Sequence, residues 1–370
     1  MHVVQVLVSL NLGGSELVAV ELAEFAAAAG HRVTVIAADG PLGERVRSCG
    51  ATHLDWPLGR KRPGTLRFIG RLRDWLIAER PDIVHVHSRL PAWICRLAMR
   101  SLGNTQRPAF ITSMHGHYSV SRYSAVMASG ERVIAVSEHI RDYTLHNYPA
   151  TDPVRVVTVP GGISRQIFTF GYKPGRDWWE QTLAEYPELR NRRLICLPGR
   201  LSRYKGHADF IELVALLRPH VPDIQGVIVG RARPGSRYRD ELEGLAERYG
   251  VLDRITFTQA RTDMPDWLAA AEIVFSLCAD PPEAFGRTVP EALHLGVPVV
   301  GWDHGGVQET LSAMFPGGAV TPGDRAALLE RSLDFLRQAP VVVPSAAFGL
   351  RDSMEKTMAV YHSVLAEKSP

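Results

Sequence analysis

Short apolar runs alternate along the first half of the chain with glycine turns and helical patterns. The runs are VVQVLVSL, HRVTVIAA, DIVHVH, AFITSMHG, RVIAVS and VRVVTVPGG. Continuous runs rich in β-branched residues and separated by helical segments are typical of parallel strands that are covered on both faces. The pattern predicts an open parallel α/β sheet.

A second series of the same kind begins near residue 193. It runs through RLICLPGRL, IQGVIVG, RITFTQ, AEIVFSL and VPVVGW, and a last helix is predicted at Ser353–Glu367 with Met354, Met358, Tyr361 and Leu365 on one face. Residues 163–193 mix glycine, proline, aromatic and charged residues without a clear period, which predicts an interdomain connection. The chain is therefore predicted to be two α/β domains in tandem, each binding ligands beyond the carboxyl ends of its strands.

Length and composition agree with two soluble globular domains. The chain has 370 residues, of which 45% are hydrophobic and 22% charged. No apolar run approaches the roughly 18 residues that span a bilayer, and the first residues predict a strand rather than a signal peptide. Four scattered cysteines form neither a CxxC pair nor a metal cluster, so we expect a reducing compartment, the cytoplasm, with Cys196 and Cys278 as buried free thiols.

Positive charge is concentrated in the first domain. Residues 1–150 hold 17 Lys and Arg against 12 Asp and Glu, and residues 60–107 hold 11 against 3. A helical stripe of Phe68, Leu72, Trp75 and Leu76 in this stretch is predicted to face the core. The basic residues form either a solvated face or a contact with an anionic membrane surface or an anionic lipid-linked substrate; they are Arg60, Lys61, Arg62, Arg67 and Arg71. No nucleic-acid module accompanies them, so nucleic acid is not expected as a partner.

The segment PPEAFGRTVPEAL, residues 281–293, carries the strongest chemical signal. It joins a predicted strand to a predicted helix, so its backbone N–H groups and the positive helix end are available to a ligand. Gly286 allows a ligand to approach the backbone, and Glu283 and Glu291 are eight residues apart, which suits two parts of one elongated ligand. A carboxylate suits paired sugar hydroxyls. Taken alone, either glutamate is equally typical of an ordinary helix surface.

EAFGRTVPE resembles the E-x7-E motif of family-4 glycosyltransferases. Further segments resemble that family in the same order: GGSE at Gly13–Glu16, His115-Gly116, VIAVS, VVTVPGGI, Gly199-Arg200-Leu201 with Lys205-Gly206, and VPVVGWDHGGVQE. The match runs from about residue 1 to about residue 310. GGSE alone is weakly specific, whereas E-x7-E at this distance from GR…KG is specific.

The resemblance implies the GT-B fold, two Rossmann-like domains that face each other across a cleft. An acceptor-side domain would comprise residues 1–165, with a terminal helix in 353–370 that crosses back to it. A nucleotide-sugar-binding domain would comprise residues 166–352.

The resemblance also implies roles for individual residues of the second domain. Arg200 and Lys205 would grip the donor diphosphate, the first as a fork and the second as a point charge. Glu283 would hold hydroxyls of the transferred sugar and Glu291 those of the ribose. The N–H groups of Phe285, Gly286 and Arg287 would meet sugar and phosphate oxygens, and Thr288 is a further donor-binding position.

In the first domain, Gly13 and Gly14 would let the backbone close over the β-phosphate region. His115 would lie near the sugar–phosphate junction, although His117, two positions on, competes for that role. Arg203, an extra basic residue in GRLSRYKG, either strengthens phosphate binding or points to solvent.

The implied reaction is retaining, with the acceptor attacking on the face that the diphosphate leaves. The donor is expected to be a nucleotide-diphosphate sugar, with a UDP-sugar favoured and a GDP-sugar possible. The acceptor is expected to be lipopolysaccharide or another cell-envelope glycan or glycolipid, at the inner face of the cytoplasmic membrane. No cofactor and no metal are expected, because Arg200 and Lys205 supply the positive charge and no acidic pair is suitably placed.

Three other functions are alternatives for a chain with these motifs. A nicotinamide-dependent dehydrogenase is disfavoured, because LGGSELVA lacks the third glycine of the dinucleotide fingerprint. A sugar-nucleotide epimerase or hydrolase of the same fold would handle the same donor without a sugar acceptor. A binding module without activity is disfavoured, because each expected diphosphate and sugar contact is present.

Overall fold

The computed structural model describes residues 1–103 and 106–368 and divides into two compact units. Unit 1 is Met1–Gly162 together with the final segment from Leu350, and unit 2 is Ile163–Gly349. The predicted boundaries, after residues 165 and 352, lie three residues later at each crossing. Parts of two predicted regions, residues 104–105 of the basic stretch and 369–370 of the terminal segment, lie outside the described residues.

Unit 1 is built on one parallel sheet with the strand order β3-β2-β1-β4-β5-β6-β7. The strands are β1 His2–Ser9, β2 Arg32–Ala38, β3 Thr52–Asp55, β4 Ile83–Val86, β5 Ala109–Met114, β6 Arg132–Ala135 and β7 Val156–Thr158. The short edge strand β3 was not predicted, because its sequence THLD is partly exposed and carries no apolar run. Every other strand of this sheet coincides with a predicted apolar run.

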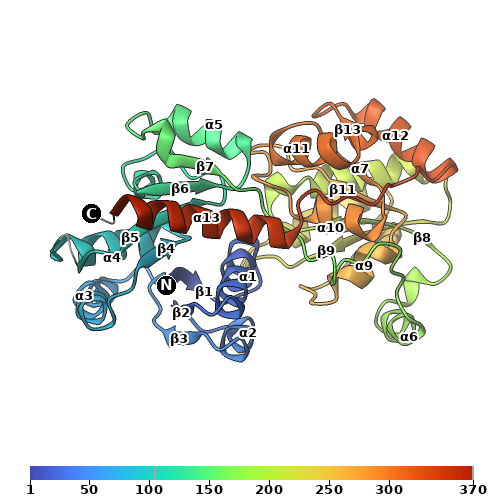
Figure 1. Ribbon diagram of the computed structural model, residues 1–370. Coiled ribbons are helices and arrows are strands. Elements are labelled where there is room, and N and C mark those ends of the chain that lie inside the picture. Colours follow the sequence, from blue (N-terminus) through green and yellow to red (C-terminus); the bar gives the residue numbers. More distant parts are fainter. Residues whose placement is uncertain (104–105, 369–370) are drawn as a thin grey trace. The chain divides into compact units, whose positions relative to one another are not determined.

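Helices cover this sheet, and the last of them comes from the far end of the chain. They are α1 Gly14–Ala28, α2 Gly43–Ser48, α3 Arg67–Glu79, α4 Arg89–Arg100, α5 Glu138–Asn147 and α13 Leu350–Lys368, with short turns η1 Pro63–Leu66, η3 Ser124–Ala128 and η4 Pro153–Arg155. The predicted apolar face of α13 is confirmed: Met354, Met358 and Tyr361 are buried in the same core as residues of β1 and α1. Figure 1 shows α13, in red, beside the other elements of unit 1.

The predicted core stripe of α3 is also found. Phe68, Leu72 and Leu76 are buried, and Trp75 packs edge-on against the ring of Trp56, with centroids 6.5 Å apart. Position 56 precedes the helix by eleven residues, so the two tryptophans fix α3 to the segment that follows β3.

Unit 2 is a second parallel sheet with the order β10-β9-β8-β11-β12-β13. The strands are β8 Arg193–Pro198, β9 Ile224–Val229, β10 Ile255–Phe257, β11 Ile273–Ser276, β12 Val299–Trp302 and β13 Ala319–Val320. The helices are α6 Arg176–Glu185, α7 His207–Leu217, α8 Tyr238–Arg248, α9 Met264–Ala270, α10 Thr288–Leu295, α11 Gly305–Met314 and α12 Arg325–Arg337, with turns η5 Pro187–Leu189, η6 Arg203–Lys205, η7 Leu252–Arg254 and η8 Pro316–Gly318. Both units therefore have the predicted Rossmann-like architecture, and the two-residue strand β13 was not predicted.

Residues 163–193 are not merely the predicted connection, because they form part of unit 2. Trp178 of α6 donates from Nε1 to Asp263 Oδ2 at 2.8 Å, and its ring packs edge-on against Trp267 at 5.2 Å. Trp178, Trp179 and Leu183 of α6 pack against the core of unit 2, and Thr182 between them is buried, so α6 does have a core-facing side. The sequence analysis missed it because glycine, proline and charged residues stand on both sides of this short helix.

The cysteines Cys95, Cys196 and Cys278 are buried and Cys49 is half-buried, and all four are free thiols. The predicted state of Cys196 and Cys278 is therefore confirmed. Within residues 1–103 and 106–368 no helix is long and apolar enough to cross a membrane.

Candidate functional site

The loop after β8 brings Lys205 to the carboxyl end of the unit 2 sheet. β8 ends at Pro198, and the turn η6 ends at Gly206, whose φ of +76° lies in the left-handed region. A Cβ at Gly206 would overlap the carbonyl oxygen of Leu277, directly after β11. Glycine is therefore required here both for its backbone angle and for its close approach, and it holds η6 against the loop that follows β11.

Lys205 forms an ion pair with Glu283, through Nζ and Oε1. Each side chain is 21% exposed, so the pair is sheltered but remains open to a ligand. Burial acts to lower the pKa of Lys205, but the Glu283 carboxylate outweighs it and holds the pKa above its ordinary value. The structure thus joins two residues that are 78 positions apart and that the sequence assigned to one site.

The loop that carries Glu283 packs against the first residues of α11. The N–H of Gly306 donates to the carbonyl oxygen of Glu283 at 2.8 Å. A side chain at Gly306 would overlap the backbone of Ala284 and Phe285. Gly306 belongs to the segment VPVVGWDHGGVQE, to which the sequence analysis gave no role in the site, but its missing side chain is what lets this loop lie on α11.

Backbone donors of the same loop remain available. In the part of the chain that the structure describes, the N–H groups of Phe285 and Gly286 make no hydrogen bond. The Phe285 ring is buried and packs on Phe348 at 5.6 Å, which fixes the loop's path. Thr288 is the first residue of α10, at the positive end of the helix dipole. These groups can bind oxygen atoms of an anionic or hydroxyl-bearing ligand.

Glu291 lies on α10 and is 7% exposed. Arg287 donates from Nε to Glu291 Oε1 at 2.9 Å, one helical turn away. The carboxylate predicted to read the ribose is thus oriented by an arginine that the sequence assigned only a backbone role. This pairing is typical of i,i+4 neighbours and was available from the spacing.

Arg200 and Arg203 lie on the same loop but contact different residues. Arg200 is exposed and donates to the Tyr204 hydroxyl at 3.0 Å, so it shares the loop with Lys205 without contacting Glu283. Arg203 pairs with Glu241 of α8 at 2.6 Å, and its Cζ lies 5.2 Å from the centre of the Tyr238 ring. The open question about Arg203 is answered for this structure: it turns toward α8.

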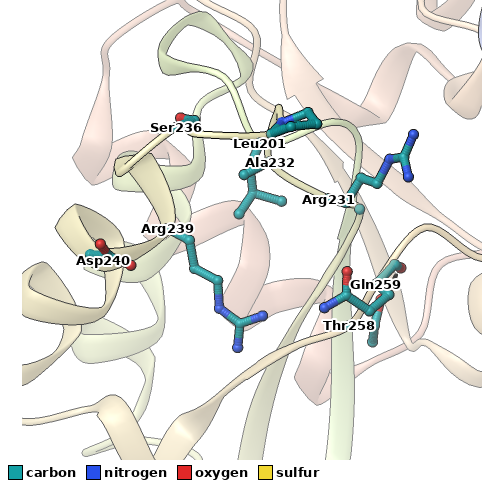
Figure 2. Close-up of a pocket in the computed structure, with 10 residues that line it drawn as sticks. Leu201, Arg231, Ala232, Ser236, Arg239, Asp240, Thr258 and Gln259 are labelled. Atoms are coloured by element: carbon teal, nitrogen blue, oxygen red, sulfur yellow. Dashed lines mark hydrogen bonds between the residues drawn. The ribbon is translucent and has the colours of Figure 1, made fainter.

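A cavity of about 260 Å³ lies at the carboxyl ends of β8, β9 and β10. Figure 2 shows Arg239 of α8 on one side of it and Thr258 and Gln259, which follow β10, on the other. Its lining residues are Leu201, Gly230, Arg231, Ala232, Pro234, Ser236, Arg239, Asp240, Thr258 and Gln259. Apart from Leu201, which belongs to the GR…KG segment, none of these was singled out from the sequence, although strand-end position was a usable signal for Gly230 and Thr258.

The neighbouring segment Arg261–Trp267 runs from the loop after β10 into α9. Arg261 pairs with Asp263 and with Glu185, both at 3.0 Å, and these two hydrogen-bonded carboxylates raise its pKa. Arg261 therefore ties this loop to α6. Its guanidinium is already paired with carboxylates of the protein.

In unit 1, Gly13 and Gly14 form the turn between β1 and α1. Gly13 is the N-cap in an extended conformation, and a Cβ there would overlap the Glu16 carboxylate, whereas nothing lies within 4 Å of the corresponding position at Gly14. The backbone at Gly14 is thus open to a close approach.

His115 follows β5 and is half-buried. Its Nε2 lies 2.9 Å from Nδ1 of His87, and burial lowers the pKa of His115 to about 4. The ring is consequently neutral at physiological pH. His117, the competing candidate, lies instead 2.7 Å from His139 through the two Nε2 atoms and packs edge-on against Tyr143.

The described residues contain no group of three or more His, Cys, Asp or Glu side chains placed to hold a metal ion. The unit 2 candidates converge on one loop cluster, and the unit 1 candidates lie at the carboxyl ends of β1 and β5.

Two family models match the chain, Glycosyltransferase Family 4 over residues 12–166 and Glycosyl transferases group 1 over residues 180–346. The alpha-maltose-1-phosphate synthase of Mycolicibacterium smegmatis is 29% identical over 64% of this chain and 63% of its own length. The lipopolysaccharide core biosynthesis mannosyltransferase LpsB of Rhizobium meliloti is 30% identical over 41% of this chain and 44% of its own length. The matched part thus spans less than two thirds of each of these relatives.

Among solved structures, Anabaena Alr3699/HepE in complex with UDP and glucose superposes with a TM-score of 0.80 at 20% identity, covering 100% of this chain and 99% of that one. At this identity the likeness establishes the fold, which is that of the GT-B glycosyltransferases. The two family models together cover most of the chain, in the order that the sequence motifs follow. The chain belongs to glycosyltransferase family 4, a family of retaining enzymes.

Proposed function

We propose that the protein transfers a hexosyl group, with retention of configuration, from a nucleotide-diphosphate sugar to a hydroxyl of a cell-envelope glycan or glycolipid. The observation that carries this proposal is the Lys205–Glu283 pair, which places a cation for phosphate beside an acceptor for hydroxyls at a strand-end loop. The free N–H groups of Phe285 and Gly286 border the same loop.

Lys205 and Arg200 stabilise the charge that develops on the departing diphosphate, because both lie on the loop after β8. In the free protein Lys205 is neutralised by Glu283. Binding of the donor therefore replaces the Lys205–Glu283 ion pair with two contacts to the ligand. Lys205 contacts phosphate oxygens, and Glu283 contacts sugar hydroxyls.

The acceptor hydroxyl attacks the anomeric carbon on the face from which the diphosphate leaves. The bond from that carbon to the phosphate oxygen breaks, and the acceptor proton passes to the leaving phosphate oxygen. No carboxylate nucleophile is needed on the pattern of retaining hydrolases. The protein's share is positioning and electrostatic stabilisation, and we propose that it requires no metal.

The cavity shown in Figure 2 is our candidate for the nucleotide base. Leu201 follows Arg200 directly, so the cavity adjoins the loop proposed to bind the diphosphate. Arg239 and Gln259 supply hydrogen-bond donors, and Leu201 and Pro234 supply apolar surface. A UDP-sugar is favoured, because the similarly folded Anabaena protein binds UDP.

For the acceptor we propose lipopolysaccharide or a related envelope glycan, since one relative is named as a lipopolysaccharide core mannosyltransferase. We further propose that unit 1 contacts an anionic inner-membrane surface through Arg60, Lys61, Arg62, Arg67 and Arg71, all of them exposed. Leu66, in the same segment, is 61% exposed. The guanidinium of Arg71 lies 4.4 Å from the centre of the Trp56 ring, which holds its charge at the surface of α3.

Charge reversal at Arg60, Lys61 and Arg62 tests the membrane contact. It should lower sedimentation with vesicles of phosphatidylglycerol and phosphatidylethanolamine, and added salt should lower wild-type sedimentation as well. The matched control reverses Arg233 and Arg237 on unit 2, which are also exposed. Equal sedimentation of both variants would remove the membrane contact from the proposal.

The donor is tested by thermal shift with a panel of UDP-glucose, UDP-galactose, UDP-N-acetylglucosamine, GDP-mannose and ADP-glucose. One nucleotide sugar should raise Tm more than its free nucleoside diphosphate does. Product analysis with and without a glycolipid acceptor then separates transfer from the competing epimerase or hydrolase activity. Release of free sugar or an epimer at the same rate without acceptor would refute the transferase.

A further inference from the structure

Polar side chains line one face of three adjacent strands in unit 1. Gln5 of β1 is paired in register with His85 of β4, and His85 with Ile111 of β5. Because side chains alternate along a strand, His87, Ser113 and His115 project from the same face as these residues. All lie in runs that are predominantly apolar.

These residues form one continuous hydrogen-bonded chain with Tyr361 of α13. His115 Nε2 lies 2.9 Å from His87 Nδ1, and His87 Nε2 lies 2.7 Å from Gln5 Oε1. Gln5 Nε2 donates to Tyr361 Oη at 3.0 Å, and Tyr361 Oη lies 2.6 Å from His85 Nδ1. The chain ends where His85 Nε2 lies 2.7 Å from Ser113 Oγ.

Burial makes every link of this chain costly to break. Gln5 and Tyr361 are 0% exposed, and His85 and His87 are 1% exposed. Burial also lowers the pKa of His85 to about 3 and holds that of His87 well below its ordinary value. Each ring is therefore neutral and carries one N–H and one acceptor nitrogen.

Neutral rings give the chain a direction. Gln5 donates through its amide nitrogen to Tyr361, so its carbonyl oxygen accepts from Nε2–H of His87. His87 is then protonated on Nε2 and must accept at Nδ1, and the donor at that position is Nε2–H of His115. Nδ1 of His115 is left as an acceptor, and it has no partner within residues 1–103 and 106–368.

We propose that Gln5, His87 and Tyr361 are positioning residues that fix the orientation and tautomer of His115, so that His115 offers Nδ1 to its ligand as a neutral acceptor. A neutral acceptor pairs with a hydroxyl and repels a phosphate oxygen. Resting on the proposed function, the ligand is a hydroxyl of the donor sugar rather than the diphosphate. Tyr361 extends this dependence to α13, about 250 residues further along the chain.

The tautomer is tested on the wild-type protein without reference to activity. Nitrogen-15 histidine spectra at neutral pH should show His115 and His87 protonated on Nε2, with a scalar coupling between His115 Nε2 and His87 Nδ1. If the side-chain amide of Gln5 were rotated so that its nitrogen faced His87, the donor and acceptor of each hydrogen bond from Gln5 to His115 would exchange. His115 would then carry its proton on Nδ1. That result would overturn the proposal.

Two variants of nearly equal shape test the positioning role. His87→Asn keeps an acceptor oxygen near the Nδ1 position, whereas His87→Leu removes it. His87→Leu should lose the coupling and weaken affinity for the best nucleotide sugar of the panel about tenfold or more, while affinity for its free nucleoside diphosphate stays within about twofold. His87→Asn should retain the sugar affinity within about threefold.

Tyr361→Phe keeps the ring and removes the link between Gln5 and His85, so it should produce the same selective loss if His87→Leu does not fold. Equal losses for sugar nucleotide and free nucleotide, or an equal effect of His87→Asn and His87→Leu, would show a merely structural role. If the coupling is present but no nucleotide sugar binds, the proposed function fails and the tautomer assignment stands.

Discussion

The two units carry their candidate site residues on sheets of the same architecture but by opposite electrostatic means. Unit 2 presents formal charges, with Lys205 paired to Glu283 and Arg287 paired to Glu291. Unit 1 presents a chain of neutral groups that ends at His115. Charge suits a diphosphate that gains charge as it leaves, whereas a directed neutral acceptor suits a hydroxyl that must be oriented. Unit 2 thus supplies electrostatic attraction for a charged group, whereas unit 1 supplies a hydrogen-bond acceptor of fixed orientation.

The largest effect is expected where charge meets the leaving group. Lys205→Met should lower kcat for sugar transfer about a hundredfold to a thousandfold, because it removes one preorganised cation from the diphosphate. Steady-state transfer assays with the donor identified by thermal shift provide the measurement.

Arg203→Met is the matched control for that substitution. Arg203 lies two residues away on the same turn, but it pairs with Glu241 and faces α8. Its removal should change kcat less than about threefold, because exposed ion pairs contribute little. Similar losses in the two variants would mean that the loop responds to its total charge and not to Lys205.

Acidification should destabilise unit 1 through its neutral histidines. Burial lowers the pKa of His85 to about 3 and of His115 to about 4. Between these values and about 6.5 the unfolded chain binds protons that the folded chain does not. Stability present above about pH 6.5 is therefore lost as the pH falls toward 4, by about 1.4 kcal/mol per pH unit for each such histidine.

Hydrogen exchange at several pH values measures this loss as opening free energies in β4 and β5. His85→Gln should reduce the slope by the share of one histidine. Unit 2 provides the contrast, because among its described residues burial lowers the pKa of two histidines, His207 and His294, against five in unit 1. Equal slopes in β4 and β8, or an unchanged slope in His85→Gln, would contradict the electrostatic difference between the units.

A smaller effect is expected from the glycine beneath the Glu283 loop. Gly306→Ala places a methyl group into the backbone of Ala284 and Phe285 and should lower the free energy of unfolding by about 1–3 kcal/mol. It should also weaken donor affinity, since the same loop carries Glu283. Gly317→Ala is the control, because nothing lies within 4 Å of its added carbon. Urea unfolding of both variants measures the difference, and equal stabilities would show that the loop tolerates displacement.

The smallest effect concerns metal ions. If Lys205 and Arg200 supply the charge that a metal would otherwise supply, EDTA should leave the transfer rate unchanged within error, and added Mg²⁺ should not raise it. A rate that falls with EDTA and returns with Mg²⁺ would show that side-chain charge alone is insufficient.

The same contrast explains what the sequence could predict. The family resemblance placed Lys205 and Glu283 in one site but gave them different ligands, so their ion pair was not predicted. The partner of Arg203 could not be predicted, because a flexible side chain on a turn reaches α8 as easily as phosphate. Residues 163–193 were misinterpreted because α6 is short and lies among glycine, proline and charged residues, which hide the core-facing side formed by Trp178, Trp179 and Leu183.

The neutral chain was missed for a different reason. Gln5, His85 and Ser113 are polar positions inside predominantly apolar strands, and each was absorbed into the strand prediction. Their alternation with buried residues marks one face of the sheet, but only the three-dimensional order β1-β4-β5 brings them together. Tyr361 was predicted as a core residue, and the structure confirms this. The role of its hydroxyl group becomes apparent only from its hydrogen bond with Gln5.

The return of α13 has a consequence for biosynthesis. Unit 2 is continuous in sequence, so all its parts have been synthesised once Gly349 has left the ribosome. Unit 1 begins first but lacks Met354, Met358 and Tyr361 from its core until α13 emerges. The unit that is synthesised first is thus completed last, and its neutral chain to His115 closes only then. An amino-terminal fragment ending at Gly162 would carry His115 without the tyrosine that orients it.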